Sequence, residues 1–170
     1  MIKWGIFIVI GLAAFGAILT LVGMALPKGH RASRTMVYRA SPDRVYSTIS
    51  DVARFPEWRS EVKSVEILGD DGRGVRFREQ GRHGTVHYRV EQRQQDSKLV
   101  TRIDDKSLPF GGTWTLDVKA VPEGTALTIT EDGEIYNPIF RVLSKVVFSP
   151  YATIDTYQAD LRKRLATTDD

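Results

Sequence analysis

The longest stretch of regular hydrophobic spacing lies near the carboxyl end of the chain, from Pro138 to Leu165. Its apolar residues recur every three or four positions, which lines one face of an α-helix, and charged residues occupy the opposite face. We therefore expect a long helix that lies on a sheet. Because proline lacks a backbone N–H and its ring crowds the preceding turn, Pro150 predicts a kink or a restart within this helix. Asn137 and Pro138 are typical of a helix start.

The region between residues 33 and 135 has a different pattern. Apolar and polar residues alternate in short runs separated by turn-forming residues, which is typical of antiparallel strands joined by short loops. Ser41-Pro42 predicts a short helix over residues 42–50, and Asp51 can cap a second short piece over residues 52–55. The predicted strands cover residues 33–39, 62–68, 74–80, 85–92, 98–103, 112–121 and 125–135.

The first part of the chain is apolar throughout. No charged residue occurs from Trp4 to Leu26, and as a helix at about 1.5 Å per residue this run would span roughly 34 Å, enough to cross a bilayer. A cleaved secretory signal is the alternative, although the run is longer than the usual apolar core of such signals. We therefore predict a retained transmembrane anchor over residues 1–27, a linker over 28–32, a globular domain over 33–166 and a tail over 167–170.

Charge and small residues add two predictions about the anchor. Positive charge is heavier after the apolar run, at Lys28, Arg31 and Arg34, than before it. This balance slightly favours a single-pass protein of the cell membrane with a cytoplasmic domain. Small residues four positions apart within the run predict at most a weak homo-oligomer through the anchor.

The composition limits the chemistry. The 170 residues carry a net charge of +3, 42% of them are hydrophobic and none is cysteine, which excludes disulfides, thiol catalysis and cysteine metal sites. The histidines are His30, His83 and His87. The last two would lie about 13 Å apart in an extended strand, too far to share one metal ion. We therefore expect no metal site and no cofactor.

A local motif and the order of the elements together resemble a known family. The motif consists of Ser41-Pro42-Asp43-Arg44-Val45-Tyr46, Asp51 and Phe55-Pro56-Glu57-Trp58. It resembles the helix-grip superfamily of START-like and Bet v 1-like domains, and most closely its bacterial SRPBCC group, the polyketide cyclase/dehydrase and lipid-transport proteins. The resemblance covers about residues 33–165. It implies an α+β fold in which a curved antiparallel β-sheet wraps around the long carboxyl-terminal α-helix, with an apolar cavity between them that two short helices close.

The strand alternation predicts which residues line that cavity. The expected lining combines inward-facing strand residues, apolar residues of the last helix and one aromatic residue near the mouth: Trp58, Phe77, Tyr88, Trp114, Leu116, Ile129, Leu143 and Tyr157. An apolar chamber with few polar groups is the usual small-molecule site. The alternative is that these side chains pack against each other and fill the core.

Two carboxylates share the inward parity and complete the predicted ligand-binding set. Glu79 continues the parity of Phe77, and Glu131 continues that of Ile129. A buried carboxylate can act as an acid or base, contact a ligand headgroup, or lie at a solvated rim. In the sheet order that the resemblance implies, several strands at about 4.8 Å each separate the two, so no close carboxylate pair and no catalytic residue are predicted.

Two surface features remain open to more than one interpretation. Five arginines occur on neighbouring predicted strands: Arg76, Arg78, Arg82, Arg89 and Arg93. Arg76, Arg78 and Arg89, together with His87, have the parity opposite to the apolar residues. The cluster therefore predicts either an outer basic face that meets anionic lipid headgroups or scattered charges partly balanced by Glu91 and Asp96. Nucleic acid is not expected, because no aromatic recognition motif accompanies the arginines. The loop over residues 104–112 is either a gate at the cavity mouth or a hairpin loop packed on its own edge.

Three functions follow from this reading. The first is membrane-anchored binding or transfer of an apolar small molecule or lipid, driven by burial of apolar surface. The second is a cyclase or dehydratase of the same fold that uses Tyr88, Glu79 or Glu131 as acid or base. The third is a non-catalytic interaction protein with a filled core. The lack of a shared catalytic residue in the superfamily favours binding over catalysis.

Overall fold

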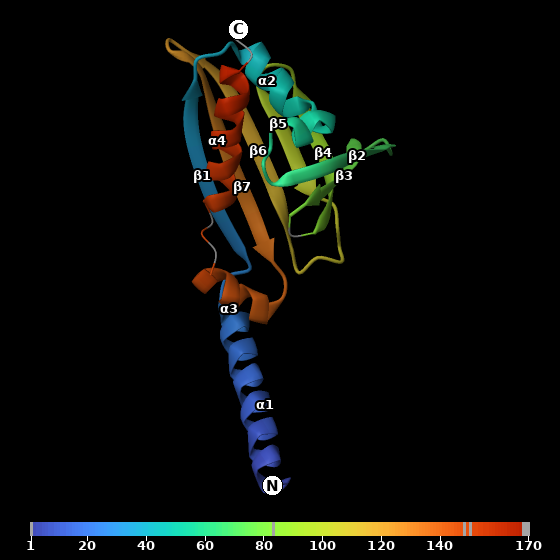
Figure 1. Ribbon diagram of the computed structural model, residues 1–170, viewed down its shortest axis with the longest axis vertical. Helices are drawn as coiled ribbons and strands as arrows, with labels where there is room; N and C mark the ends of the chain where they lie inside the picture. The colour runs from blue at the N-terminus through green and yellow to red at the C-terminus, as the bar shows by residue number, and fades with distance from the viewer. Residues whose placement is uncertain (1, 83, 148, 150, 168–170) are drawn as a thin grey trace.

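The computed structural model describes residues 2–82, 84–147, 149 and 151–167. Figure 1 shows a curved sheet that is covered on one side by helices, with one long helix projecting from its lower end. In chain order the elements are α1 (Ile2–Ala25), β1 (Gly29–Tyr38), α2 (Pro42–Ser50), η1 (Val52–Glu57), β2 (Val62–Asp70), β3 (Val75–Gly81), β4 (Thr85–Gln94), β5 (Lys98–Ile103), β6 (Phe110–Val121), β7 (Gly124–Ile135), α3 (Pro138–Val147) and α4 (Ala152–Ala166).

The strands of the described residues form one seven-stranded antiparallel sheet. Its order is β1-β7-β6-β5-β4-β3-β2, so strands from β2 to β7 pair with their neighbours in sequence, as short turns between strands favour. The chain crosses from β1 at one edge to β2 at the other through α2 and η1. This is the predicted α+β arrangement, an antiparallel sheet with a carboxyl-terminal helix.

The core lies between the inner face of the sheet and the helices α2 and α4. α2 buries Val45, Tyr46 and Ile49. Ile49 lies four residues after Val45 and three after Tyr46, so the three side chains share one face of the helix. α4 buries Ile154 and Leu161, both with no exposed surface. Neither helix is long enough to be stable alone, so packing on the sheet holds both in place.

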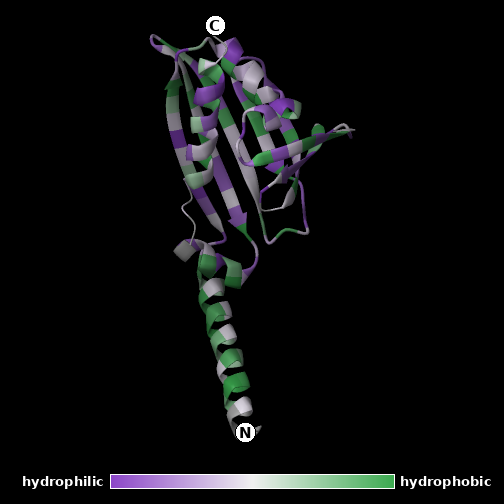
Figure 2. Cartoon of the chain, viewed as in Figure 1, coloured by the Kyte–Doolittle hydropathy of each residue, from purple (hydrophilic) through white to green (hydrophobic). Residues whose placement is uncertain are grey.

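α1 is apolar along almost its whole length. Residues Phe7–Ala25 have a mean hydropathy of 2.5, and only 6% of this stretch is buried. Figure 2 shows the helix in green and white with hardly any hydrophilic colour, whereas strands of the sheet alternate between purple and green. By length and composition α1 fits a membrane span, and a signal sequence meets the same two criteria.

The segment predicted as a linker, residues 28–32, is not a tether. Gly29 to Ala32 already belong to β1 and pair with Glu134 to Glu131 of β7. The backbone N–H of Ile135 donates to the carbonyl of Lys28 at 2.8 Å. The sheet therefore begins almost directly after α1, because β7 extends far enough to pair with these residues. Apart from Thr167, the predicted tail lies outside the described residues.

The predicted long helix over residues 138–165 is two helices. α3 ends at Val147 and α4 begins at Ala152, which agrees with the predicted restart, although Pro150 itself lies outside the described residues. The side-chain Oδ1 of Asn137 accepts the N–H of Phe140 at 3.0 Å, as the predicted cap at the start of α3 requires. α4 lies on the sheet, but α3 lies across the upper end of α1 in Figure 1.

Candidate ligand-binding site

An aromatic cluster occupies the centre of the space between the sheet and α4. Phe77 on β3 stacks on Tyr88 on β4 with ring centroids 5.2 Å apart. Trp58, which follows η1, meets Tyr157 of α4 edge to face at 5.1 Å, and Trp114 on β6 lies 6.0 Å from the same ring. The fold thus brings five of the predicted lining residues together, in contact with each other.

Further apolar residues pack around these rings. Leu116 and Ile129 are 3% and 0% exposed. Phe55 of η1 joins the two parts of the cluster, because its ring lies 5.6 Å from that of Trp58 and 6.3 Å from that of Phe77. These rings therefore pack against each other and against the apolar side chains around them.

A buried ion pair lies beside the cluster. Arg59 Nη1 donates to Glu79 Oε2 at 2.6 Å, and the two side chains are 14% and 10% exposed. The Arg59 guanidinium also lies over the rings of Phe55 and Tyr157, at 4.8 and 5.1 Å from their centroids. Glu79 points inward as its parity predicted. Its partner escaped the sequence analysis because Arg59 lies in an irregular turn, where no periodicity marks its direction.

The two predicted carboxylates both affect the hydroxyl of Tyr88 electrostatically. Burial raises the pKa of the Tyr88 hydroxyl, and the charges of Glu79 and, to a smaller extent, Glu131 raise it further. Glu131 lies on β7, which three strands separate from β3, and its nearest charged partner is His30, with Nε2 3.4 Å from Oε1. Burial also raises the pKa of Glu131, which His30 partly offsets. No hydrogen bond or ion pair of the described residues joins the two carboxylates.

Trp58 leaves a polar atom without a partner. Its Nε1 is buried and makes no hydrogen bond within the part of the chain that the structure describes. A buried polar group without a partner costs about 1–3 kcal/mol. An acceptor atom on a bound molecule would remove this cost.

Leu143 lies away from the other predicted site residues. It is on α3 beside α1, with 47% of its surface exposed. The prediction placed Leu143 and Tyr157 on one apolar face of the segment from residue 138 to 165, kinked or restarted at Pro150, so that both would face the sheet. Because α3 and α4 are separate helices, the face that α3 presents is set by its own neighbours.

The open part of the site lies between α2, η1 and the inner face of the sheet near β2, β3 and β4. Two adjoining pockets of about 430 and 620 Å³ occur there, and both are lined by Ser50 and Arg93. The first is completed by Asp51, Val52, Ala53, Ile67 and Val75. The second is completed by Asp43, Tyr46, Ser47, Gln95 and Asp96. None of the ten predicted site residues lines either pocket.

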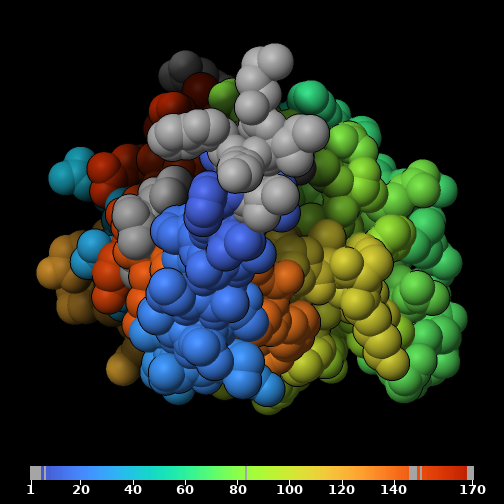
Figure 3. Space-filling model, turned by 90° about the horizontal axis from the view of Figure 1, so that it is seen from below, coloured from blue at the N-terminus to red at the C-terminus, as the bar shows by residue number. Residues whose placement is uncertain are grey.

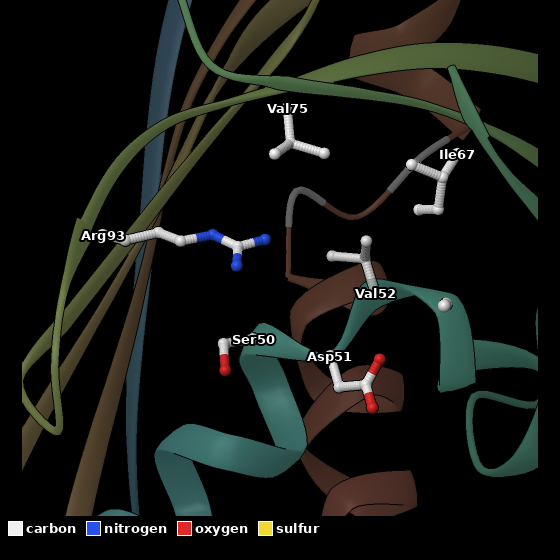
Figure 4. A pocket seen from close by; sticks show the side chains of 7 residues that line it. Ser50, Asp51, Val52, Ile67, Val75 and Arg93 are labelled. Atoms are coloured by element: carbon white, nitrogen blue, oxygen red, sulfur yellow. The ribbon is translucent and has the colours of Figure 1, made fainter. Parts of the chain in front are cut away.

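A β-bulge turns Arg93 toward these pockets. The register between β4 and β5 shifts between Val90 and Gln92, after which Arg93 pairs with Leu99, a core residue that is 1% exposed. Directly opposed residues of an antiparallel pair share a face, so Arg93 lies on the core side, and bulges commonly re-aim a side chain in this way. Figure 4 shows its guanidinium pointing into the pocket between Ser50 and Val75. Strand parity alone would have placed it outside with Arg89.

The remaining arginines of the predicted basic face are paired with acids. Arg76 lies 3.5 Å from Asp104, Arg82 lies 3.7 Å from Glu61, and Arg78 contacts Glu66. Arg89 is 7% exposed and contacts both Asp71 and Asp104. The charges on this face are therefore largely balanced, by acids other than those that sequence proximity suggested. Arg93 has no ion-pair partner among the described residues.

His30 and His87 line neither pocket. His87 Nδ1 is 2.9 Å from Asp105 Oδ2, and hydrogen bonds from Ser107, more than the His87 contact, lower the pKa of Asp105 to about 2. His83 lies outside the residues that the structure describes. Within those residues, no group of three or more His, Asp or Glu side chains is arranged to hold a metal ion.

Comparison with solved structures shows the fold in other proteins. A START superfamily protein from Mycobacterium smegmatis is 21% identical over 82% of this chain and 99% of its own, with a TM-score of 0.64. A protein from Thermus thermophilus is 21% identical over 84% of this chain and 99% of its own, with a TM-score of 0.66. Norcoclaurine synthase from Thalictrum flavum is 10% identical over 86% and 91%, with a TM-score of 0.65.

Sequence comparison identifies the family. No curated protein matches the chain significantly. The family model described as polyketide cyclase / dehydrase and lipid transport matches residues 29–167, which is the whole of the domain from β1 to the end of α4. The chain therefore belongs to this family, and it has the helix-grip fold of the START superfamily protein.

Proposed function

We propose that this protein is a membrane-anchored binding module for an apolar or amphipathic small molecule or lipid that carries an acidic headgroup. The observation that carries the proposal is the groove beside α2, which consists of the two adjoining pockets that Ser50 and Arg93 both line. Its wall includes the apolar side chains of Val52, Ile67 and Val75, and Arg93 supplies a cation without an acidic partner among the described residues. The first pocket also holds the Asp51 carboxylate, and Asp43 and Asp96 line the second, so Arg93 is the one cation of the described lining. An apolar wall with a few placed charges fits an amphiphile better than a fully polar solute.

The family supports a ligand-binding role, since lipid transport is part of its description. The groove borders the core directly, because Val52 is 3% exposed and Val75 packs against the core cluster. A ligand whose tail displaces water from this wall gains roughly 25 cal/mol per Å² of apolar surface buried. The acidic headgroup gains a charge-assisted hydrogen bond to the guanidinium.

The contacts of α1 support the retained anchor over a cleaved signal. Arg141 of α3 donates hydrogen bonds to the carbonyls of Gly23 and Leu26 at 2.6 and 3.1 Å. These contacts make the end of α1 part of the packed domain, and cleavage near them would remove acceptors of a buried arginine. Lys28, Arg31 and Arg34 continue to favour a cytoplasmic domain. Self-association through α1 stays a prediction.

Acid–base catalysis has weaker support. Glu79 is held by Arg59, and a raised pKa keeps Tyr88 protonated near neutral pH, where it is a poor base. The pKa of Glu131 is raised, but no second carboxylate of the described residues contacts it to form an acid–base pair. We therefore propose binding without a chemical step.

The test is a binding measurement on the full chain in nanodiscs. A fluorescent long-chain carboxylic acid is titrated against the wild type and the Arg93→Gln variant, and the corresponding alcohol serves as the uncharged probe. We expect Arg93→Gln to weaken binding of the acid by about tenfold, since a hydrogen bond to a charged group contributes about 1.5–3 kcal/mol. Binding of the alcohol should not change.

Matched variants control for general surface effects. Arg78→Gln removes a paired arginine from the outer face. Ile67→Ser and Val37→Ser remove apolar side chains that are both 47% exposed, but only Ile67 lines the groove. We expect Ile67→Ser to weaken the binding of both probes, and we expect Arg78→Gln and Val37→Ser to leave the binding of both unchanged. Equal affinity of acid and alcohol in every variant, or the absence of binding, would rule out this function.

A further inference from the structure

A second apolar surface lies at the junction of the domain with α1. Outside α1, the large apolar side chains that the structure describes as exposed are Val37, Ile67, Leu68, Tyr136, Ile139 and Leu143. The last three follow one another closely in the chain, since Tyr136 lies just before α3 and Ile139 and Leu143 lie on it. Ile139 and Leu143 are four residues apart and therefore share one face of the helix. Exposed apolar side chains that gather in this way mark an interaction surface.

The loop between β5 and β6 is fixed to the same surface. The carbonyl of Pro109 accepts the N–H of Tyr136 at 2.8 Å and that of Asn137 at 3.4 Å. Phe110 stacks on Phe140 with ring centroids 6.2 Å apart. Neither predicted state of this loop, a gate or a loop packed on its own edge, describes these contacts. Figure 3 looks from the α1 end and shows the orange β7–α3 region beside α1 and the yellow loop next to it.

α3 is held rigidly on α1. Arg141 is 2% exposed and its guanidinium donates to Gly23 and Leu26 at the end of α1, as well as to Ile135 and Tyr136 before α3. Gly23 allows close approach, because a Cβ at this position would lie 2.0 Å from the carbonyl oxygen of Pro138. The depth of α3 along α1 is therefore fixed at the carboxyl end of the apolar stretch.

We propose that α3, together with Tyr136, is an interfacial helix that lies in the headgroup region of the bilayer that α1 spans. This inference rests on the proposed anchor. The apolar stretch of α1 ends at Ala25, so α3 lies at the depth where acyl chains give way to headgroups. An exposed apolar face then enters the bilayer, Lys145 remains available to anionic lipids, and a tyrosine occupies the position that such side chains prefer.

The consequence is a domain with a fixed orientation on the membrane. A single helix with a free linker would let the domain rotate, whereas two elements seated in the bilayer and joined by Arg141 prevent this. α2, which borders the groove, lies near the end of the sheet opposite α1 (Figure 1). The groove is therefore presented away from the lipid surface.

The test measures the depth of α3 in vesicles that contain the full chain. Because the chain has no cysteine, Leu143→Cys places a single environment-sensitive fluorophore on α3. Val37→Cys is the matched control, since both native side chains are 47% exposed and Val37 lines neither pocket. We expect lipids with a nitroxide near the top of the acyl chain to quench the label at position 143 several-fold more than the label at position 37. Equal quenching would overturn the inference.

Two further measurements separate the causes of a negative result. If alkaline carbonate extracts the protein from the vesicles, the proposed anchor fails and this inference fails with it. If the protein is retained but position 143 is not quenched, the interfacial helix alone fails. An apolar environment shifts the emission of the fluorophore at position 143 to shorter wavelength. If this shift disappears when the protein is diluted in lipid, a second copy of the chain covers the surface, which also overturns the inference. Emission and quenching that do not depend on dilution support it.

Discussion

The helices α3 and α4 come from one amphipathic stretch of sequence but pack against different partners. α4 lies on the inner face of the sheet and buries Ile154, Tyr157 and Leu161. α3 lies on the end of α1, and its apolar residues Ile139 and Leu143 stay exposed. Both helices have an apolar face, and in both a buried polar side chain binds backbone carbonyls. Arg141 has this role in α3, and Gln158 has it in α4.

The difference shows that periodicity identifies an apolar face but not its partner. The apolar face of α4 is covered by the rest of the protein, so it contributes to folding whether or not lipid is present. The apolar face of α3 is shielded from water only if something outside the described residues covers it, and we have proposed that this is lipid. The same substitution should therefore have different effects in the two helices.

The largest expected effect comes from Leu161→Ala in α4, with Leu143→Ala in α3 as its matched control. Leu161 has no exposed surface, so its truncation should lower the free energy of unfolding by about 2–5 kcal/mol. Leu143→Ala should change it by no more than about 0.5 kcal/mol in detergent, as for a surface position. Chemical denaturation followed by tryptophan fluorescence measures both. Similar losses for the two variants would mean that α3 is packed as deeply as α4.

A smaller effect is expected from Arg141→Met. This change removes the donor that binds carbonyls at the end of α1, and hydrogen bonds to a charged group contribute about 1.5–3 kcal/mol. Hydrogen exchange should become faster in α3 and at the end of α1 but not in α4. Gln158→Leu is the counterpart, because Gln158 Nε2 donates to the carbonyl of Arg34 at 3.1 Å. It should loosen α4 and leave α3 unchanged, and a reversed pattern would contradict the separation of the two helices.

Tyr157→Phe should change the stability least at neutral pH, but its effect on stability should be clear at alkaline pH. Burial raises the pKa of Tyr157, which the nearby Arg59 only partly offsets. A phenol with a higher pKa in the folded state stabilises the protein fully below its unfolded pKa of about 10, and this contribution is lost as the pH rises further. As the pH rises above about 10, the free energy of unfolding of the Tyr157→Phe variant should therefore fall less than that of the wild type.

Tyr136, next to α3, is the control for this titration. A hydrogen bond to Glu134, more than burial, raises its pKa, and its side chain is 47% exposed, so solvent weakens the effect. Tyr136→Phe should leave the alkaline unfolding curve close to that of the wild type. If Tyr136→Phe shifts the curve as far as Tyr157→Phe, the burial of α4 does not explain the alkaline loss.

Local pattern predicted most of the fold. The helix over residues 42–50 and the strand over 98–103 have the predicted bounds, and the other strands differ by a few residues at their ends. Strand alternation placed Phe77, Tyr88 and Trp114 in the interior, and helical spacing placed Tyr157 there, because these strands and α4 are regular and each has one buried face. The first strand was predicted too short, since its pairing with the end of β7 depends on a distant part of the chain.

The sequence by itself determined the elements, their order, the apolar first helix and the inward parity of the regular strands, because these depend on residues close together in the chain. Only the tertiary structure decided where Arg93 and Leu143 lie. Arg93 faces the groove because a bulge reverses the parity of β4, and the all-polar run after Val90 contains no apolar residue to mark that reversal. Leu143 lies beside α1 because Arg141 and Gly23 hold α3 there. Contacts between distant segments set both positions, and local periodicity carries no information about them.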